Sequence, residues 1–419
     1  MKILLITSDK YPPHRPAAKV IFGRELVNRG HEIDWLIQAE SEQISAGNRP
    51  LGRGIVCVGP TDDGQSRVRR LRKHWKDLRN DLRMFGLARR RHYDIIQVKD
   101  KYLSALPALL LARLTGAAFC YWLAYPHGEA SLNHFQSGTA RYRWLYWLRG
   151  HAFRLLLYRV LLPNASHVFV QSEQMKRDIA QHGISMTTMT AIPGSLDLAD
   201  VPYEQPREVE LSEIQPEEHA IVYLGTLDRA RRLEFLLRVH SEVVSRFPRA
   251  KLYLVGAGHT EEDNQSLLRE SQRLSLEDHV VFTGHLPMAK AWEYIRRANV
   301  CVSPYYPSFI LNSTSPTKLI EYMAMARPVV GNDHPEQSLV LHKSGAGICV
   351  SWCEAEFAAA ICRILCNSVE WTARAYEGRR YVETERTNAV MADLVEQCYE
   401  RSLVVPEQSE NRSLDSAGR

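Results

Sequence analysis

The sequence has few of the features that mark secreted, membrane-spanning or zinc-binding proteins. Its eight cysteines occur without a CxxC pair, so we expect reduced thiols in a cytoplasmic protein rather than disulfides or a zinc site. No uninterrupted apolar stretch of about 18 residues occurs, so no membrane span is predicted. The first apolar run, residues 3–6, is too short for a signal peptide and fits a first β-strand. The chain of 419 residues, 45% hydrophobic and 24% charged, is globular in composition and long enough for two domains.

Two enzyme signatures are also missing. The stretch GAGHT at 256–260 has Gly-x-Gly after a predicted strand, but Glu261 takes the place of the third glycine of a nicotinamide-binding fingerprint. No Ser-His-Asp or nucleophilic-cysteine signature is present. A nicotinamide site is therefore not expected.

Acidic residues are scarce in one segment and absent from another. Residues 67–91 contain eleven Lys or Arg and two acids, and residues 141–159 contain five arginines, six aromatics and no acid. Apolar residues recur in the first segment at spacings of three and four, which predicts an amphipathic helix with a cationic face.

These two segments allow three interpretations. Their apolar stripes could pack on their own domain, or the basic residues could bind nucleic acid, for which no motif is present. The joint recurrence of basic and aromatic residues favours a surface that rests on anionic lipid. The predicted membrane or acceptor surface comprises Arg69, Arg70, Arg72, Lys73, Trp75, Trp144 and Trp147.

Strand and helix patterns alternate along the chain, which indicates parallel α/β sheets. Predicted strands lie at 2–7, 32–38, 55–59, 93–98, 118–124 and 166–172, and again at 220–227, 250–258, 279–286 and 299–306. The prediction is two Rossmann-like doubly wound domains, 1–196 and 220–368, that face each other across a cleft and are joined by an acidic linker at 197–219. Residues 369–404 are predicted as C-terminal helices that cross back to the first domain, and 405–419 as a disordered tail.

The loops after the strands of the second half carry the candidate ligand site, because ligands bind beyond the carboxyl ends of such strands. Arginines follow the first strand there, where they could clamp a diphosphate. A helix with Ser315 as N-cap and Pro316 as its first residue is predicted to offer unpaired N–H groups to the same anion. The candidate residues of this site are Gly225, Thr226, Arg229, Arg231, Arg232, Gly256, Ser313, Thr314, Ser315, Pro316, Thr317, Lys318 and Glu321.

Lys318 and Glu321 share one edge of that helix. Glu321 would accept hydrogen bonds from vicinal hydroxyls such as those of a ribose. The alternative is an i, i+3 ion pair on a solvent face, worth roughly a few tenths of a kcal/mol.

Several stretches resemble one family in order and spacing. They are VFVQSEQMKRDIAQHGI (168–184), YLGTLDRARRLEFLL (223–237), LYLVGAG (252–258) and SPTKLIEYMAMARPVV (315–330). Together they resemble the glycosyltransferases of family 4, over almost the whole chain. The resemblance implies GT-B architecture, a nucleotide sugar as co-substrate, retention at the anomeric carbon, and no metal or other cofactor. The last stretch is similar to the branch that builds bacterial surface polysaccharides.

The resemblance also implies roles for single residues. Glu321 matches the second glutamate of the Glu-x7-Glu motif, which binds the donor ribose, while Ser313 stands where the first glutamate contacts the donor sugar. Thr226 stands at the family's arginine position, and the family's lysine falls at Arg231 or Arg232. His127 matches a histidine that approaches the reacting sugar, so His127 and Glu321 are the catalytic candidates. A loop histidine without a catalytic role is the alternative for His127.

By this resemblance the protein is expected to be a hexosyl- or N-acetylhexosaminyltransferase of surface polysaccharide or glycolipid synthesis. Its partners would be a UDP- or GDP-sugar, a saccharide or lipid-linked acceptor and an anionic membrane surface, with no nucleic acid. We expect it to be cytoplasmic and peripheral at the inner face of the plasma membrane. Two alternatives stay open: a GT-B sugar-nucleotide epimerase, and a catalytically silent membrane-associated scaffold, which Ser313 in place of a glutamate makes conceivable.

Overall fold

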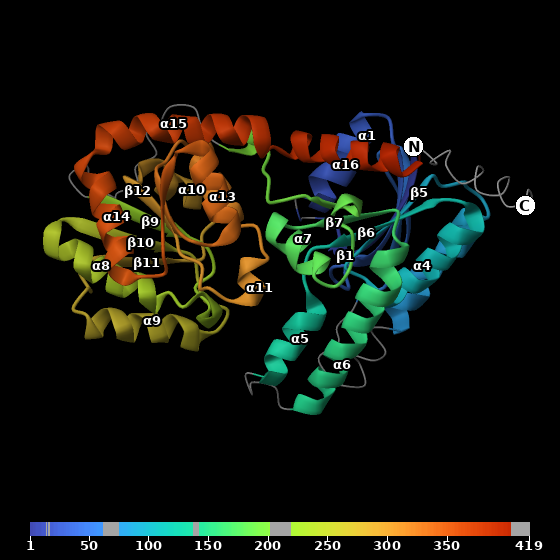
Figure 1. Ribbon diagram of the computed structural model, residues 1–419, viewed down its shortest axis with the longest axis horizontal. Helices are drawn as coiled ribbons and strands as arrows, with labels where there is room; N and C mark the ends of the chain where they lie inside the picture. Colours follow the sequence, from blue (N-terminus) through green and yellow to red (C-terminus); the bar gives the residue numbers. More distant parts are fainter. Residues whose placement is uncertain (14, 16, 62–74, 137–141, 202–218, 404–419) are drawn as a thin grey trace, which may run out of the picture. The chain divides into compact units, whose positions relative to one another are not determined.

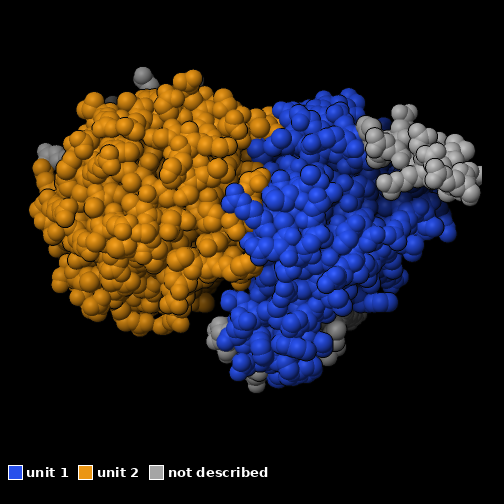
Figure 2. Space-filling view, in the orientation of Figure 1, with its two compact units in different colours: residues 1–171, 175–192, 391–419 blue, residues 172–174, 193–390 orange. Residues whose placement is uncertain are grey.

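The computed structural model describes residues 1–419 except 14, 16, 62–74, 137–141, 202–218 and 404–419. The chain divides into two compact units (Figure 2). Unit 1 comprises Met1–Gln171, Met175–Ile192 and the C-terminal residues from Met391, and unit 2 comprises Ser172–Gln174 and Pro193–Val390. Most of the predicted linker and the whole predicted tail lie outside the described residues.

Within the described residues, unit 1 is built on an eight-stranded sheet with the order β3-β4-β2-β1-β5-β6-β7-β8 (Figure 1). The strands are β1 (Lys2–Tyr11), β2 (Glu32–Ala39), β3 (Gly47–Leu51), β4 (Gly54–Gly59), β5 (Ile95–Lys99), β6 (Ala118–Leu123), β7 (His167–Val170) and β8 (Met189–Ala191). All neighbours pair in parallel except β3 with β4. The parallel strands are nearly continuous apolar runs, as expected of a sheet that is covered on both faces. The edge strand β3 was not predicted, because its sequence GNRPL has no apolar run.

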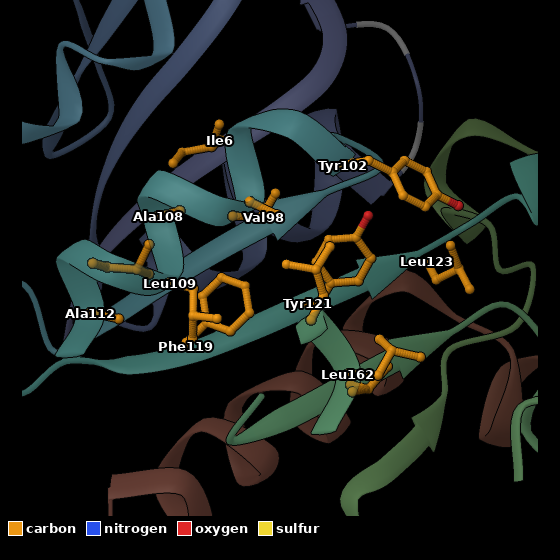
Figure 3. Close-up of a cluster of buried hydrophobic side chains, with 14 of the residues drawn as sticks. Ile6, Val98, Tyr102, Ala108, Leu109, Ala112, Phe119, Tyr121, Leu123 and Leu162 are labelled. Atoms are coloured by element: carbon orange, nitrogen blue, oxygen red, sulfur yellow. The ribbon is translucent and has the colours of Figure 1, made fainter. Parts of the chain in front are cut away.

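Helices cover this sheet. They are η1 (Ala17–Glu25, a π-helix), α1 (Leu26–Asn28), α3 (Met84–Ala88), α4 (Tyr102–Thr115), α5 (His127–Gln136), α6 (Arg143–Leu155), η2 (Leu156–Leu161, a π-helix), α7 (Glu173–Ala180) and α16 (Asn388–Leu403). Figure 3 shows Ala108, Leu109 and Ala112 of α4 in one apolar cluster with Phe119 and Tyr121 of β6. The opposite face of α4 leaves four leucines 40–70% exposed, namely Leu103, Leu106, Leu110 and Leu114.

An amphipathic helix is predicted within residues 67–91. The first part of this segment lies outside the described residues, and residues 75–81 are helical. A turn at 82–83 then interrupts the helix before α3 begins at Met84.

Two residues of the apolar stripe do not fit the interpretation in which this segment packs on its own domain. Trp75 and Leu82, from the predicted apolar stripe, are 67% and 41% exposed, whereas Asp81 is fully buried. The reason is a partner that is distant in sequence: Lys101 Nζ lies 2.6 Å from Asp77 Oδ1 and 2.7 Å from Asp81 Oδ2. The ion pair turns the acids inward and leaves the tryptophan on the surface.

Unit 2 carries, in its described part, a six-stranded sheet with the order β11-β10-β9-β12-β13-β14. The strands are β9 (His219–Leu224), β10 (Ala250–Val255), β11 (Val280–Gly284), β12 (Val300–Ser303), β13 (Val329–Asn332) and β14 (Gly347–Val350). Every neighbouring pair is parallel. This is the Rossmann order 3-2-1-4-5-6, with its topological switch point between β9 and β12.

The helices of unit 2 flank this sheet (Figure 1). They are η6 (Arg229–Arg231, a 3-10 turn), α8 (Glu234–Arg246), α9 (Glu261–Arg273), α10 (Met288–Arg297), α11 (Phe309–Asn312), α12 (Thr317–Ala324), α13 (Pro335–Ser344), α14 (Glu354–Cys366) and α15 (Ser368–Glu385). The capping box of Thr260 and Asp263 begins α9.

The two C-terminal helices belong to different units. In α15, Arg379 Nη1 donates a hydrogen bond of 2.6 Å to the carbonyl of Ala324 in unit 2. In α16, the buried Tyr399 hydroxyl donates to Gln97 Oε1 of β5 at 2.8 Å, and Glu396 lies 2.7 Å from His31 Nε2. The chain therefore returns to unit 1 only for its last described helix.

Candidate active site

Two glycine loops meet at the carboxyl ends of β9 and β10 in unit 2. Gly225 and Gly256 adopt φ angles of +148° and +145°. A Cβ on Gly256 would lie 2.0 Å from the Gly225 carbonyl oxygen, and a Cβ on Gly225 would lie 3.3 Å from Lys318 Nζ. Both positions favour glycine, because side chains rarely adopt these φ angles and a Cβ on Gly256 would collide with the neighbouring backbone.

Lys318, in the first turn of α12, is buried at this edge rather than solvent-exposed. It is 8% exposed, and its Nζ lies 4.0 Å from the ring centroid of Tyr223 and 5.1 Å from that of Tyr305. The amine has no hydrogen-bond partner among the described residues. Burial, followed by the positive charge of Arg231, lowers the pKa of Lys318 well below its usual range. A buried amine without an acceptor is unfavourable on its own and gains most from an anionic ligand.

The three arginines that follow β9 lie in different surroundings. The Arg231 guanidinium lies 5.3 Å from the Tyr305 ring centroid and is close enough to lower the pKa of Lys318. Arg229 is 62% exposed in its side chain and pairs with Glu262 at 3.1 Å. Arg232 is exposed and stacks on a tyrosine, Tyr306, at 5.3 Å. Of the three, only Arg231 joins Lys318.

Glu321 lies one turn further along α12. Burial raises the pKa of its carboxyl, and the nearby Lys318 opposes that rise. None of the described side chains donates a hydrogen bond to this carboxylate, so its oxygens remain available as acceptors. The alternative of an i, i+3 ion pair on a solvent face is wrong, because Lys318 is buried against two tyrosine rings.

Residues 313–317 mostly serve the structure of the loop before α12. Ser313 Oγ donates to the Phe309 carbonyl at 3.1 Å and Thr314 Oγ1 donates to the Leu311 carbonyl at 2.6 Å. Ser315 as N-cap and Pro316 as the first helical residue are both wrong, because Pro316 is the N-cap and Thr317 begins the helix.

The side chain of Ser315 has a different role from capping. Its Oγ accepts a hydrogen bond of 2.8 Å from the backbone N–H of Gly194, where the chain enters unit 2. Thr226, at the family's arginine position, donates to Asp228 Oδ2 at 3.1 Å. Neither hydroxyl is directed to a ligand by these contacts.

Unit 1 has its own polar cluster at the switch point between β1 and β5, which the sequence reasoning missed. Asp9 Oδ2 accepts hydrogen bonds from Lys99 Nζ and Thr7 Oγ1, both at 2.7 Å. Burial opposes the charge of Asp9, but Lys99 outweighs it and lowers the pKa of the carboxyl. Asp100, with a φ of +54°, accepts from the Ala124 N–H at 2.8 Å, and burial raises its pKa to about 6. The signal in the sequence was an acid or lysine directly after each of two apolar runs.

His127 begins helix α5 instead of lying in a loop as predicted. Its ring centroid lies 5.8 Å from that of Tyr102 and 4.9 Å from that of Tyr125. Burial, followed by the charge of Arg149, lowers its pKa. The imidazole is therefore neutral at pH 7 and can both donate and accept a hydrogen bond.

Helix α6 exposes most of its apolar side chains. Trp144, Trp147, Leu148 and Leu155 are 64%, 47%, 52% and 65% exposed. Packing of these side chains on their own domain does not fit this exposure. Arg69, Arg70, Arg72 and Lys73, from the other predicted stripe, lie outside the described residues.

Among the described residues, no group of three or more His, Cys, Asp or Glu could hold a metal ion. No helix in the same ranges is long and apolar enough to cross a membrane.

Sequence comparisons match both halves of the chain. Residues 22–194 match the model of the glycosyl transferase 4-like domain, and residues 218–367 match that of glycosyl transferases group 1. An uncharacterized glycosyltransferase of Methanocaldococcus jannaschii is 23% identical over 185 residues, which are 43% of this chain and 42% of that relative. The match therefore spans less than half the length of the curated relative.

Solved structures match almost the whole chain. Sucrose-phosphate synthase from Thermosynechococcus elongatus has a TM-score of 0.72 at 18% identity, over 96% of this chain and 98% of that one. Anabaena HepE in complex with UDP has a TM-score of 0.67 at 13% identity, over 96% and 100%. The lipopolysaccharide outer core galactosyltransferase WaaB has a TM-score of 0.61 at 14% identity, over 95% and 99%. At these identities the structures establish the fold, and the two family models establish that this chain belongs to the GT-B glycosyltransferases of family 4.

Proposed function

We propose that the chain transfers a hexosyl or N-acetylhexosaminyl group from a nucleotide sugar, with retention, to a saccharide or lipid-linked acceptor in surface polysaccharide or glycolipid synthesis. The observation that carries the donor site is the buried Lys318 amine, which has no hydrogen-bond partner in the described chain and lies beside Arg231. The Lys318 amine and the Arg231 guanidinium, neither of which forms an ion pair with a described carboxylate, favour a ligand with several negative charges, such as a diphosphate. The crystal structure of HepE is that of a complex with UDP, so UDP is the first nucleotide to test, ahead of GDP.

The proposed chemistry follows from where charge develops. In a glycosyl transfer, negative charge grows on the leaving diphosphate while positive charge grows on the sugar ring. Lys318, Arg231 and the backbone N–H groups that begin α12 would stabilise the diphosphate electrostatically. We propose that Glu321 accepts hydrogen bonds from the ribose hydroxyls, and that the neutral His127 bonds the transferred sugar. No resident metal is needed in this scheme, because the cations come from side chains.

The acceptor is proposed to reach unit 1 from a membrane. Helix α5 begins with His127, and α6, which packs against it, exposes Trp144 and Trp147. We propose that this face rests on an anionic leaflet with the tryptophan rings near the headgroups. A protein bound in this way would act as a peripheral enzyme on lipid-linked acceptors.

The test of the donor site is a thermal-shift panel of UDP, GDP, ADP and their sugars, with and without EDTA. A nucleotide at a hundred times its Kd should add about 2.7 kcal/mol of stability. Donor hydrolysis or transfer by the purified protein excludes the silent scaffold. A change in the configuration of the donor sugar without an acceptor would indicate an epimerase. A panel in which no nucleotide raises Tm would refute the proposed site.

Replacing Glu321 by alanine should weaken nucleotide binding by roughly 1.5–3 kcal/mol, as for the loss of a charged hydrogen-bond partner. The fold should persist, because the described chain gives this carboxylate no hydrogen bond to lose. Isothermal titration with UDP measures the effect. Glu377→Ala in α15, whose side chain is 57% exposed, is the control and should leave Kd unchanged. A folded Glu321→Ala protein with normal Kd would show that the ribose lies elsewhere.

Replacing His127 by alanine should lower kcat more than it raises the donor KM, because its proposed contact forms in the transition state. The control is His134→Ala, a second histidine of α5, which is exposed. A change in KM alone would make His127 a binding residue rather than a catalytic one.

A further inference from the structure

A pocket on unit 1 is not used by the proposed transfer reaction. It has a volume of about 440 Å³, opens to solvent, and lies where α6 and η2 approach the end of α7. Its polar lining comes from His151, Arg154, Tyr158, Arg159, Gln181 and His182. All of these side chains can donate hydrogen bonds, and no acid of the described chain lines the pocket.

The positive charge of this pocket is only partly neutralised from outside it. Arg154 Nε lies 3.5 Å from Glu129 Oε1, and the same oxygen accepts a hydrogen bond of 2.7 Å from the Tyr158 hydroxyl. The Tyr158 ring stacks on His182, with centroids 3.9 Å apart and planes at 23°. These contacts fix the wall of the pocket. Arg159 is exposed and forms no ion pair with any described residue.

This set of donors fits a phosphate group. Two guanidinium groups offer paired N–H donors to phosphate oxygens, and a neutral amide and imidazole can complete the set. A carboxylate ligand would use fewer of these donors.

The position of the pocket on α6 indicates which phosphate. Leu155, 65% exposed, lines the pocket, and Trp147, 47% exposed, lies on the same helix with its ring centroid 4.6 Å from that of His151. Exposed apolar side chains next to a basic pocket match the boundary between acyl chains and headgroups of a bilayer. A soluble phosphate ester has no acyl chain that would contact the exposed side chains of Trp147 and Leu155.

We propose that this pocket binds the phosphate group of an anionic phospholipid headgroup and so holds α6 against the membrane. The inference rests on the proposed membrane contact of α6, but not on the donor site or on sugar transfer. It adds a specific headgroup site to what would otherwise be a diffuse attraction between charges.

The experiment compares variants in sedimentation with vesicles of phosphatidylglycerol and phosphatidylcholine. Arg159→Gln should weaken binding about 10- to 150-fold, as for a lost charged hydrogen bond. Arg143→Gln, at the start of the neighbouring helix α6 and outside the pocket, removes the same charge and should cost only about fivefold, the general effect of one charge near the surface. Gln181→Ala, which changes no charge, should also weaken binding. Thermal unfolding checks that all variants fold.

The outcomes separate the possibilities. Equal effects of Arg159→Gln and Arg143→Gln, with none from Gln181→Ala, would show diffuse charge attraction and overturn the headgroup site. Glycerol 1-phosphate and inorganic phosphate are tested by titration without vesicles. Phosphate binding that requires Arg159, while vesicle binding does not, would assign the pocket to a soluble phosphate and overturn the lipid. Absence of vesicle binding by the unaltered protein would overturn both this site and the membrane contact, but would leave the nucleotide panel as the test of the transferase.

Discussion

Replacing Lys101 by methionine is expected to destabilise the protein by about 3–5 kcal/mol, the cost of leaving a buried charge without its partner. Lys101 is 7% exposed and Asp81 is fully buried. The ammonium group lies within 2.7 Å of one oxygen each of Asp77 and Asp81, and Ser104 Oγ donates to Asp81 at 2.6 Å. Burial opposes the charge of Lys101, but the two carboxylates outweigh it and raise its pKa. Thermal unfolding should show Tm lower by roughly 6–20 °C for a unit of this size.

Two further variants make this result specific. Lys2→Met removes a lysine whose side chain is 51% exposed and 4.0 Å from Glu32, and it should change stability by no more than about 0.5 kcal/mol. Lys101→Met combined with Asp81→Leu removes both buried charges and should recover part of the loss. A single Lys101→Met variant with unchanged Tm would mean that the pair is absent in solution.

Replacing Lys318 by methionine should weaken ligand binding without destabilising the protein, unlike Lys101→Met. The affinity for UDP should fall about 10- to 150-fold, because a charged contact to the diphosphate is lost. Stability should stay the same or increase, because an apolar side chain of similar length replaces a buried amine that has no acceptor in the described chain. Titration calorimetry and thermal unfolding measure the two quantities. The control is Lys343→Met, an exposed lysine of α13, which should change neither.

The same residue gives a pH dependence with a definite sign. Burial, together with the charge of Arg231, holds the pKa of Lys318 in the folded protein well below the ordinary 10.5. Between these two pKa values the unfolded chain binds more protons than the folded one, so the contribution of Lys318 to stability rises with pH. A bound diphosphate favours the charged amine, so binding takes up a proton and affinity strengthens as pH falls through the same window.

Calorimetry in two buffers with different ionisation enthalpies measures this proton uptake. Uptake that vanishes in Lys318→Met assigns it to that amine. Uptake of the same size in the variant would assign it to another group and contradict the proposed role of Lys318.

Where the spacing of residues within one segment determines the structure, the sequence was sufficient to predict it. The strand and helix alternation predicted two Rossmann-like domains, and the GT-B fold is confirmed by the solved relatives. Leu319, Tyr322 and Met323 recur at helical spacing in the sequence, which predicts one apolar face, and all three are buried. Strand β3 and helix α5 were missed, because GNRPL has no apolar run and HGEASLNHFQ has a weak apolar period.

Where the position of a side chain depends on a partner that is distant in the sequence, the sequence was not sufficient to predict it. The spacing of Trp75 and Leu82 left open which face of the segment is buried, and only the ion pair between Lys101 and Asp81 shows that Asp81 lies inside. The candidate donor site shows the same limit. Three arginines follow β9, and only the position of Tyr305 shows that Arg231 lies with Lys318.

Helix α16 has a consequence for how the protein is made. Tyr399, which this helix brings to Gln97, lies 302 residues later in the chain, so a ribosome working at about 5–20 residues per second needs roughly 15–60 s to deliver it. During that time all of unit 2 emerges, while the rings and amide that Tyr399 will cover, Phe169 and Gln97 among them, stay without that cover. The core of unit 1 therefore lacks this helix while the whole of unit 2 is being synthesised.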